Sequence, residues 1–290
     1  MKFIKMINFI KYIAKLSRFR FWVYLWGPYI LGYTFKLEGF QNYLSVSFFL
    51  HLFYFLIPAN ILLYGINDFF DVDTDSNNLK KTELELKYSQ RDFKPYSLAI
   101  AFSVIYTLVL LIIVEHTLIE RIYLAAFIVL AYLYSGKPFR FKALPVIDFI
   151  SNILYIFPGL IGYYETSQML IDIKAIIILG LWTGAMQLFS AIPDILPDKQ
   201  AGLKTTAVIL REKNSLVLCF IMWLIFAVLA LAMGSFGMFS ILFFLYPLIV
   251  SVLIIRPQIR ISKIYGLFPY INFIIGGFIF LLLFISRVIK

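Results

Sequence analysis

The sequence predicts an all-α fold that crosses the membrane nine times. Of its 290 residues, 62% are hydrophobic and only 14% are charged, which lies far outside the range of soluble domains. Apolar stretches long enough to span a bilayer also recur along the whole chain. The nine helices are expected, with boundaries good to about 2–4 residues, at 19–37, 44–66, 95–114, 117–135, 146–164, 173–192, 214–233, 236–255 and 266–286.

Basic residues are divided unevenly between the two sides of this bundle. If the N-terminus is cytoplasmic, the cytoplasmic segments hold 21 of the 26 Lys and Arg residues, as is typical of membrane proteins. We therefore expect a multi-pass protein of the cell inner or plasma membrane, with its C-terminus on the opposite side. This distribution, together with anionic lipid, explains the net charge of +10 without a nucleic-acid partner.

Residues 1–18 are expected to form an interfacial amphipathic helix. One side of its helical projection carries the basic residues Lys5, Lys11, Lys15 and Arg18. Lysines interrupt the segment, so a cleavable signal peptide is not expected. Residues 19–290 would then form a single transmembrane domain. Cys219 is the only cysteine, which excludes an internal disulfide and argues against a cysteine metal site.

Two acidic motifs follow apolar runs, one after the second expected helix and one after the sixth. They read Asn67-Asp68-Phe69-Phe70-Asp71-Val72-Asp73-Thr74-Asp75 and Asp194-Ile195-Leu196-Pro197-Asp198. Residues four apart share one face of a helix, so the carboxylates of each motif would converge. Like charges that close repel one another unless a cation lies between them. Mg²⁺ bound to a substrate phosphate fits best, because it prefers oxygen ligands and is held by few carboxylates.

The first motif has two other interpretations. A calcium loop of the EF-hand type beginning at Asp71 needs Gly at its sixth position and Glu at its twelfth, where the sequence has Ser76 and Thr82. A solvated acidic loop that merely ends a membrane helix fits one such motif as well as a metal site does. Two motifs on the same side of the membrane favour the metal site.

Basic and polar residues accompany these motifs on the predicted cytoplasmic side. A basic loop after the fourth helix contains Lys137, Arg140 and Lys142. The second motif is followed by Lys199 and Lys204. These charges either set the topology or neutralise a diphosphate.

Single polar residues within the helices suggest contacts inside the bundle. Asn60 and Tyr64 precede Asn67 on one helical stripe, and such groups face a cavity or bond to another helix. Asp148 is expected to pair with Lys142 or Arg140 rather than to act as a base. Of Arg18 and Arg20, one is expected to anchor at the headgroups, while the other could meet an anionic substrate.

The two motifs resemble those of the UbiA superfamily of intramembrane prenyltransferases, N-D-x-x-D-x-x-x-D after the second helix and D-x-x-x-D after the sixth. Within that superfamily, the residues at 18–28, 57–81, 134–159 and 182–207 resemble most closely those of the lycopene elongase type. The chain departs from that group at Phe19, where proline is usual, and at Leu196, where glutamate is frequent.

The resemblance implies nine helices around a central cavity open to lipid, and transfer of an allylic prenyl group from a prenyl diphosphate to a lipophilic acceptor. That acceptor is either lycopene or a related carotenoid, or the aromatic ring of a quinone or tocopherol precursor. No obligatory protein partner is evident.

The resemblance also implies two Mg²⁺ ions and a set of site residues. The ligands are Asn67, Asp68, Asp71 and Asp75 for one ion and Asp194 and Asp198 for the other. The carboxylates expected to be catalytic are Asp71, Asp75, Asp194 and Asp198. The candidates for contact with the diphosphate are Lys137, Arg140, Lys199 and Lys204, and those for the polar cavity wall are Asn60 and Tyr64.

A cation-coupled transporter is the alternative from another class. Transporters tend to place ionisable groups near the middle of the bilayer. Here every Asp and Glu lies within a few residues of a predicted helix end. This placement favours the enzyme.

Overall fold

The computed structural model describes residues 2–70, 93–114 and 117–289, and within these ranges the chain forms helices and turns but no strand. The predicted all-α membrane fold is confirmed. The helices, in chain order, are α1 (Lys2–Leu16), α2 (Val23–Phe35), α3 (Val46–Leu56), α4 (Pro58–Phe70), α6 (Phe93–Val109), α7 (Leu118–Ser135), α8 (Ile147–Ile150), α9 (Phe157–Ser167), α10 (Ile173–Ala191), α11 (Ile195–Gln200), α12 (Thr206–Met233), α13 (Leu245–Ile255) and α14 (Ile261–Val288).

Eight of the nine predicted spans contain a helical segment long and apolar enough to cross a membrane, counting only the described ranges. The exception is the first, 19–37, where a 3₁₀ turn at Phe19–Phe21 precedes the 13-residue helix α2. The chain is therefore a multi-pass membrane protein.

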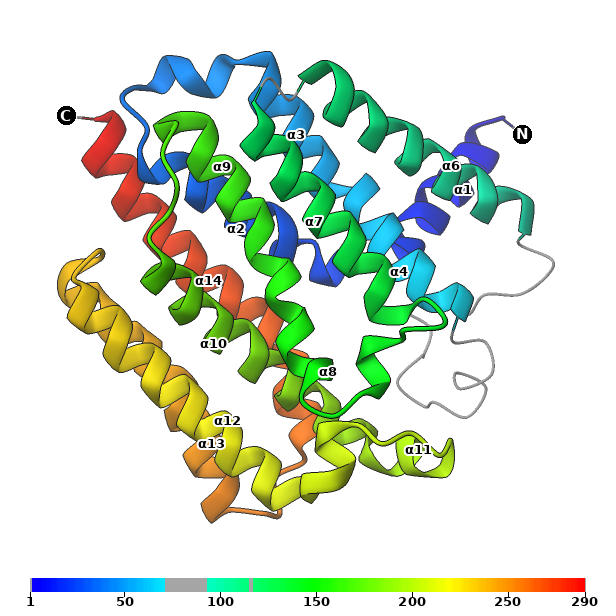
Figure 1. The fold of residues 1–290 in the computed structure, drawn as a ribbon, viewed down its shortest axis with the longest axis vertical. Coiled ribbons are helices and arrows are strands. Elements are labelled where there is room, and N and C mark those ends of the chain that lie inside the picture. The colour runs from blue at the N-terminus through cyan, green and yellow to red at the C-terminus, as the bar shows by residue number, and fades with distance from the viewer. Residues whose placement is uncertain (1, 71–92, 115–116, 290) are drawn as a thin grey trace.

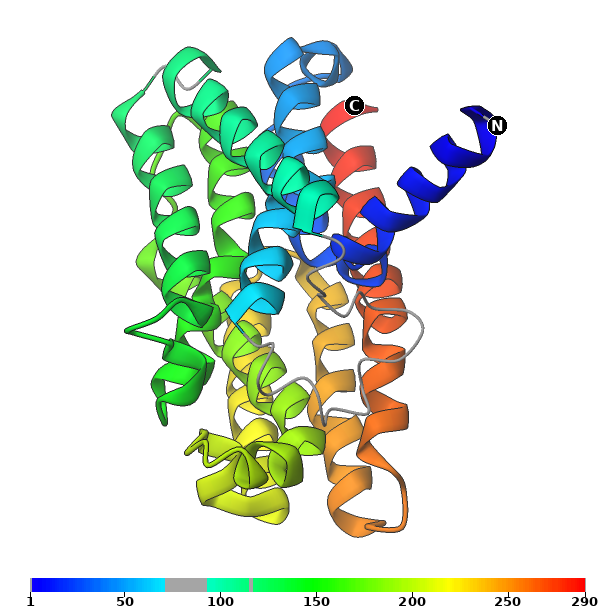
Figure 2. The ribbon, with the colours of Figure 1, turned by 90° about the vertical axis from the view of Figure 1, so that its right-hand side faces the viewer.

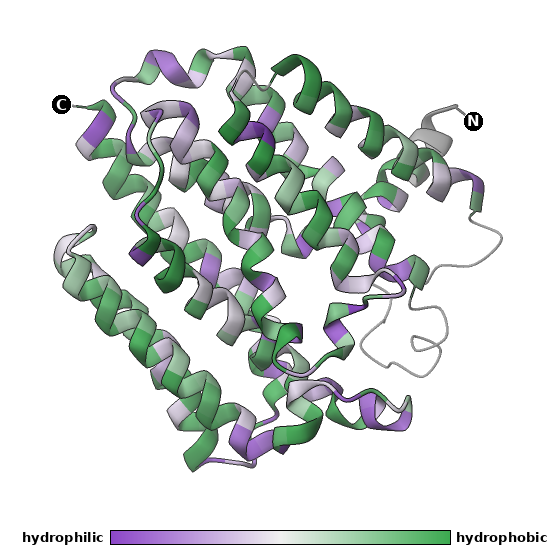
Figure 3. Cartoon of the chain, viewed as in Figure 1, coloured by the Kyte–Doolittle hydropathy of each residue, from purple (hydrophilic) through white to green (hydrophobic). Residues whose placement is uncertain are grey.

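The helices form one bundle, and α11 lies at one of its ends. α12 and α13 lie on one side and α6 on the other, with α2, α9, α10 and α14 between them (Figure 1). α1 leaves the bundle at an angle to the other helices (Figure 2). The long helices are mostly hydrophobic, whereas hydrophilic residues collect in α11 and the connections beside it (Figure 3). The C-terminus lies at the opposite end from α11 (Figure 1).

Several predicted spans are interrupted rather than continuous. The second is divided into α3 and α4 at Ile57, next to Pro58, which has no N–H to continue the helix. The fifth passes from α8 through a 3₁₀ turn, Ser151–Ile156, into α9. The predicted start at 214 is also late, because α12 begins at Thr206 and its backbone breaks at Arg211 (φ 63°). Three of the predicted spans are therefore not single straight helices.

The packing of α2 against α9 brings two backbones into contact at the centre of the bundle. A Cβ at Gly32 would overlap the carbonyl oxygen of Gly159 on the facing helix. In the same way, a Cβ at Gly162 would overlap the carbonyl oxygen of Tyr29. A Cβ at Gly159 would lie 3.2 Å from the Pro28 carbonyl oxygen. Small residues allow such van der Waals contact between helices where lipid removes the hydrophobic driving force.

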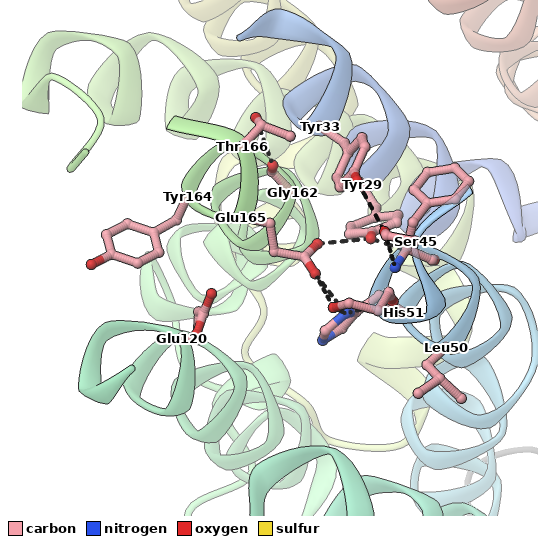
Figure 4. Close-up of polar contacts among 12 residues, drawn as sticks. Tyr29, Tyr33, Ser45, Leu50, His51, Glu120, Gly162, Tyr164, Glu165 and Thr166 are labelled. Carbon is pink, nitrogen blue, oxygen red and sulfur yellow. Dashed lines mark hydrogen bonds and ion pairs between the residues drawn. The ribbon is translucent and has the colours of Figure 1, made fainter. Parts of the chain in front are cut away.

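A buried polar cluster joins α2, α3 and α9 at the end of the bundle away from α11 (Figure 4). The Glu165 carboxylate accepts hydrogen bonds from Tyr29 Oη at 2.7 Å and Ser47 Oγ at 2.5 Å. Its Oε1 also lies 3.0 Å from His51 Nδ1. Because the side chains of His51 and Glu165 are 0% and 8% exposed, this pair is removed from solvent and fixes the three helices relative to one another.

The glycine contact leads to a prediction about stability. Gly162→Ala should lower the apparent melting temperature in detergent, since overpacking of this kind typically costs about 1–3 kcal/mol. Gly180→Ala is the matched control, because its Cβ would meet only Ile153 Cδ1, at 3.8 Å. Equal melting temperatures for the two variants would contradict the close backbone approach.

Candidate active site

A cavity of about 290 Å³ opens beside α4, α10 and α11, at the end of the bundle where hydrophilic residues gather. Its wall combines three kinds of side chain. The carboxylates and carboxamides are Asn67, Asp148, Asn152, Gln187, Asp194 and Asp198; the cations are Arg18, Arg140 and Lys142; and the aromatic residues are Phe21, Tyr24, Tyr64, Tyr134, Phe149, Tyr155, Trp182 and Tyr265. We refer to the first two kinds as the ionic region and to the third as the aromatic region; the two meet where the Arg18 guanidinium lies 4.8 Å from the centroid of the Tyr64 ring.

Two prolines shape the segment that carries the second motif. α10 ends at Ala191, and a 3₁₀ turn with Pro193 in its first turn leads to Asp194. α11 then begins at once and presents Asp198 to the same cavity. Proline is tolerated in a first helical turn because its missing N–H would have no partner there. The turn thus brings both carboxylates of the motif to one wall.

The first motif is described only in part. Asn67 lies in the last turn of α4 and lines the cavity together with Asp194 and Asp198. Asp71 and Asp75 lie outside the described residues. Within the described ranges, no three His, Cys, Asp or Glu side chains group closely enough to hold a metal ion. The carboxylate and amide oxygens that do line the cavity are nevertheless of the type that Mg²⁺ prefers.

Asp68 lies apart from this wall. It is 1% exposed, and its Oδ1 accepts a hydrogen bond from Arg18 Nη2 at 2.7 Å in an ion pair. The Arg18 guanidinium also lies 4.8 Å from the centroid of the Tyr64 ring. Arg18 has a left-handed backbone (φ 50°) between α1 and the following 3₁₀ turn. The structure thus places Asp68 in a clasp between the N-terminal segment and α4, not on the cavity wall.

The basic residues expected at the site separate into two groups. Arg140 lines the cavity, as does Lys142, whose Nζ donates a hydrogen bond to Asn67 Oδ1 at 2.9 Å. The other three candidates, Lys137, Lys199 and Lys204, are exposed and are not among the residues of the wall. Arg20 donates to the Gly266 carbonyl at 3.3 Å.

The expected pairing of Asp148 with Lys142 or Arg140 is wrong. The Asp148 carboxylate instead accepts hydrogen bonds from the Thr206 backbone N–H and hydroxyl, both at 2.6 Å. Thr206 opens α12, whose first N–H groups have no partner within the helix. A carboxylate is favourable at this positive end of the helix dipole. Asp148 therefore anchors the start of α12 to α8.

Tyr64 and Asn60, predicted on the same stripe, have different surroundings. Tyr64 lines the cavity, and its Oη lies 3.4 Å from Tyr155 Oη. Asn60 is fully buried away from the cavity wall and donates from Nδ2 to the carbonyls of Phe55 and Leu56 at 2.7 and 3.1 Å. The helix break at Pro58 leaves these carbonyls without their usual partners. Asn60 therefore stabilises the break.

Two carboxamides of the cavity wall were not singled out from the sequence as a pair. Asn152 Nδ2 donates to Gln187 Oε1 at 2.7 Å, and Gln187 Nε2 donates to Tyr134 Oη at 2.5 Å. A signal exists in the sequence, since Gln187 is polar, lies within an apolar span and precedes Asp194 by seven residues, or two helical turns.

The clasp between Arg18 and Asp68 makes a testable prediction. In a double-mutant cycle of Arg18→Met and Asp68→Asn, the two substitutions should be coupled in thermal stability by about 1–3 kcal/mol, because each single change leaves a buried charge without its ionic partner. Arg20→Met, combined with Asp68→Asn, is the control. Additive effects in both cycles would contradict an energetically significant ion pair.

Comparison with known proteins agrees with this architecture. The lycopene elongase/hydratase of Halobacterium salinarum is 39% identical over 269 residues, which cover 92% of this chain and 94% of that protein. The enzyme of the same name from Haloarcula japonica is 37% identical, over 91% of this chain and 88% of its own length.

Solved structures share the fold. A UbiA homolog from Archaeoglobus fulgidus bound to GPP and Mg²⁺ superposes with a TM-score of 0.65 at 21% identity, covering 92% of this chain and 99% of that one. The apo structure of a UbiA homolog from Aeropyrum pernix has a TM-score of 0.67 at 15% identity, covering 91% and 98%. Residues 21–266 match the model of the UbiA prenyltransferase family. The chain therefore belongs to the UbiA family and is a prenyltransferase enzyme.

Proposed function

We propose that this enzyme transfers an allylic prenyl group from a prenyl diphosphate to a terminal double bond of lycopene or a related carotenoid, with Mg²⁺ as cofactor. The observation that carries the proposal is the cavity itself, whose wall combines Asn67, Asp194 and Asp198 with cations and aromatic rings. The relatives named lycopene elongase/hydratase, at 35–39% identity over most of their length, support the acceptor class.

The ionic region is suited to a metal-bound diphosphate. We infer one ion for each motif, with Asn67, Asp71 and Asp75 as ligands of one and Asp194 and Asp198 as ligands of the other. When bound, Mg²⁺ supplies positive charge that favours departure of the diphosphate. Arg140 and Lys142 add fixed positive charge at the same wall, where it can stabilise the leaving group as its negative charge develops.

The aromatic region is suited to the allylic cation that remains. Phe21 stacks against Tyr24 and Tyr265, with ring centroids 5.9 and 6.5 Å apart, and Tyr155 meets Tyr24 edge to face at 6.3 Å. A cation over such a face gains roughly 0.5–2 kcal/mol per ring. The apolar wall also limits water while the cation exists.

The contacts of Arg18 favour an alkene over an aromatic carboxylate as acceptor. A carboxylate in the cavity would need a cation of its own. Arg18, one of the two arginines considered for that role, forms an ion pair with Asp68, and Arg20 contacts a backbone carbonyl. An apolar acceptor such as an alkene needs no cation to pair with it.

We further infer that the α11 end of the bundle faces the cytoplasm, that α1 lies at that membrane interface, and that residues 19–290 form one transmembrane domain. The bias of Lys and Arg supports this orientation.

Orientation is tested with reporters. A reporter fused after Lys290 should be found on the outer side of the membrane, because the C-terminus lies at the opposite end from α11. A reporter inserted at the exposed Gly202, just after α11, should be cytoplasmic. Signals from the same side would contradict the proposed orientation.

Catalysis is tested with purified protein in lipid, radiolabelled dimethylallyl diphosphate, and lycopene or an aromatic acceptor in parallel. Label should enter the carotenoid only with Mg²⁺ and should be lost with chelator. Asp194→Ala and Asp198→Ala should each lower turnover by about 10²-fold or more, since the charge that stabilises the leaving group would be lost.

Asp172→Ala is the matched control for these variants. Asp172 is an exposed carboxylate that caps the opposite end of α10, so its removal should leave turnover unchanged. Full activity of the Asp194 and Asp198 variants would refute the assigned ligands, and label in an aromatic product alone would refute the carotenoid acceptor.

A further inference from the structure

The cavity contains a carboxamide pair, Asn152 and Gln187, that the proposed prenyl transfer does not use. The two residues come from different segments, the 3₁₀ turn Ser151–Ile156 and α10. Apolar and aromatic neighbours on the same wall include Leu154, Trp182 and Met186. Polar groups in such surroundings need partners, because burial without hydrogen bonds is unfavourable.

The hydrogen bonds of this pair leave acceptor capacity for the cavity. Gln187 Nε2 donates to Tyr134 Oη, which directs Gln187 Oε1 toward Asn152 Nδ2. Asn152 Oδ1 accepts no hydrogen bond from any described residue, although Asn152 is only 6% exposed and lines the cavity. A carbonyl oxygen in that position favours a donor, and a molecule in the cavity can supply it.

The carboxamide pair also lies deeper in the cavity than the aspartates, at the distance where the prenyl group of a bound donor would be. Gln187 precedes Asp194 by seven residues, which corresponds to about 10 Å along a helix axis. Asn152 follows Asp148, another residue of the wall, by four residues, or about 6 Å. A diphosphate held at Asp194 and Asp198 would place its prenyl group on the side of the carboxamides.

We propose that Asn152 and Gln187 bind a water molecule that adds to the tertiary cation formed when an alkene acceptor is prenylated. This inference rests on the proposed function. Asn152 Oδ1 is an open acceptor, whereas Gln187 Oε1 accepts from Asn152 Nδ2 at 2.7 Å and from Ser190 Oγ only at the long distance of 3.5 Å. A bound water would point one hydrogen at Asn152 Oδ1 and the other at Gln187 Oε1, in place of the long Ser190 contact, and its oxygen lone pair at the cation. Two to four polar partners are what an ordered water requires.

The bonds and charges of this step balance. The carbon–oxygen bond of the donor breaks, and the diphosphate leaves with the electron pair. The π electrons of the acceptor form the new carbon–carbon bond, which leaves a tertiary cation. The water oxygen then bonds to that carbon, and one proton of the resulting oxonium passes to the departed diphosphate. Without the water, the cation ends by losing a carbon-bound proton, so the two residues decide between an alcohol and an alkene.

The test is the ratio of the two products, measured in ¹⁸O-water with labelled dimethylallyl diphosphate and lycopene. Wild-type protein should give a prenylated alcohol carrying ¹⁸O. Asn152→Leu and Gln187→Met should retain carbon–carbon bond formation but lower the ratio of alcohol to alkene by about tenfold. Because both products derive from one cation, a general loss of activity or folding does not change their ratio.

Gln41→Met is the matched control, since it makes the same chemical change at an exposed position far from the cavity in sequence and should not change the ratio. An unchanged ratio in both site variants, or wild-type product without ¹⁸O, would overturn the water site while leaving prenyl transfer intact. Absence of labelled carotenoid from the wild-type reaction would instead overturn the proposed acceptor and, with it, the water site.

Discussion

The backbone contact between α2 and α9 is the constraint on which the arrangement of the site depends. Gly32 and Gly162 leave no room for a Cβ between the two helices, and a Cβ at Gly159 would be tightly packed. α2 begins with aromatic residues of the cavity wall, and α9 continues directly from the turn that carries Asn152 and Tyr155. At the other end of these helices, the Glu165 cluster joins them to α3 (Figure 4). Close approach at the centre and polar contacts at one end therefore fix the cavity wall at the other.

Polar side chains support the helix breaks around the site. In lipid, backbone groups left free by a break must be satisfied within the protein. Asn60 bonds the carbonyls beside Pro58, and Asp148 bonds the first N–H and hydroxyl of α12. These side chains look like candidate ligands in the sequence because they are polar residues in apolar surroundings. Their contacts show that structural support of a break uses the same residue types as catalysis.

The acidic residues of the two motifs also divide by role. Asp194 and Asp198 remain half-buried on the cavity wall, where a cation and a diphosphate can reach them. Asp68 instead pairs with Arg18, which stacks on Tyr64 of the same wall. The ion pair joins the segment after α1 to α4, and Arg18 itself lines the cavity, so the N-terminal segment contributes to the site. Buried charges are stable there because the guanidinium offsets the cost of removing the carboxylate from water.

Hydropathy and motif spacing alone determined the all-α membrane fold, eight of the spans and the family, because apolar length and local spacing are properties of consecutive residues. They also predicted Asn67, Asp194 and Asp198 as candidate ligands, which the structure brings to one cavity. The partners of Asp68, Asp148 and Asn152 depended on tertiary structure, since Arg18, Thr206 and Gln187 lie 50, 58 and 35 residues away from them. No periodicity encodes such pairings. They are decided by which helices pack together: the N-terminal segment with α4, α8 with α12, and the turn before α9 with α10.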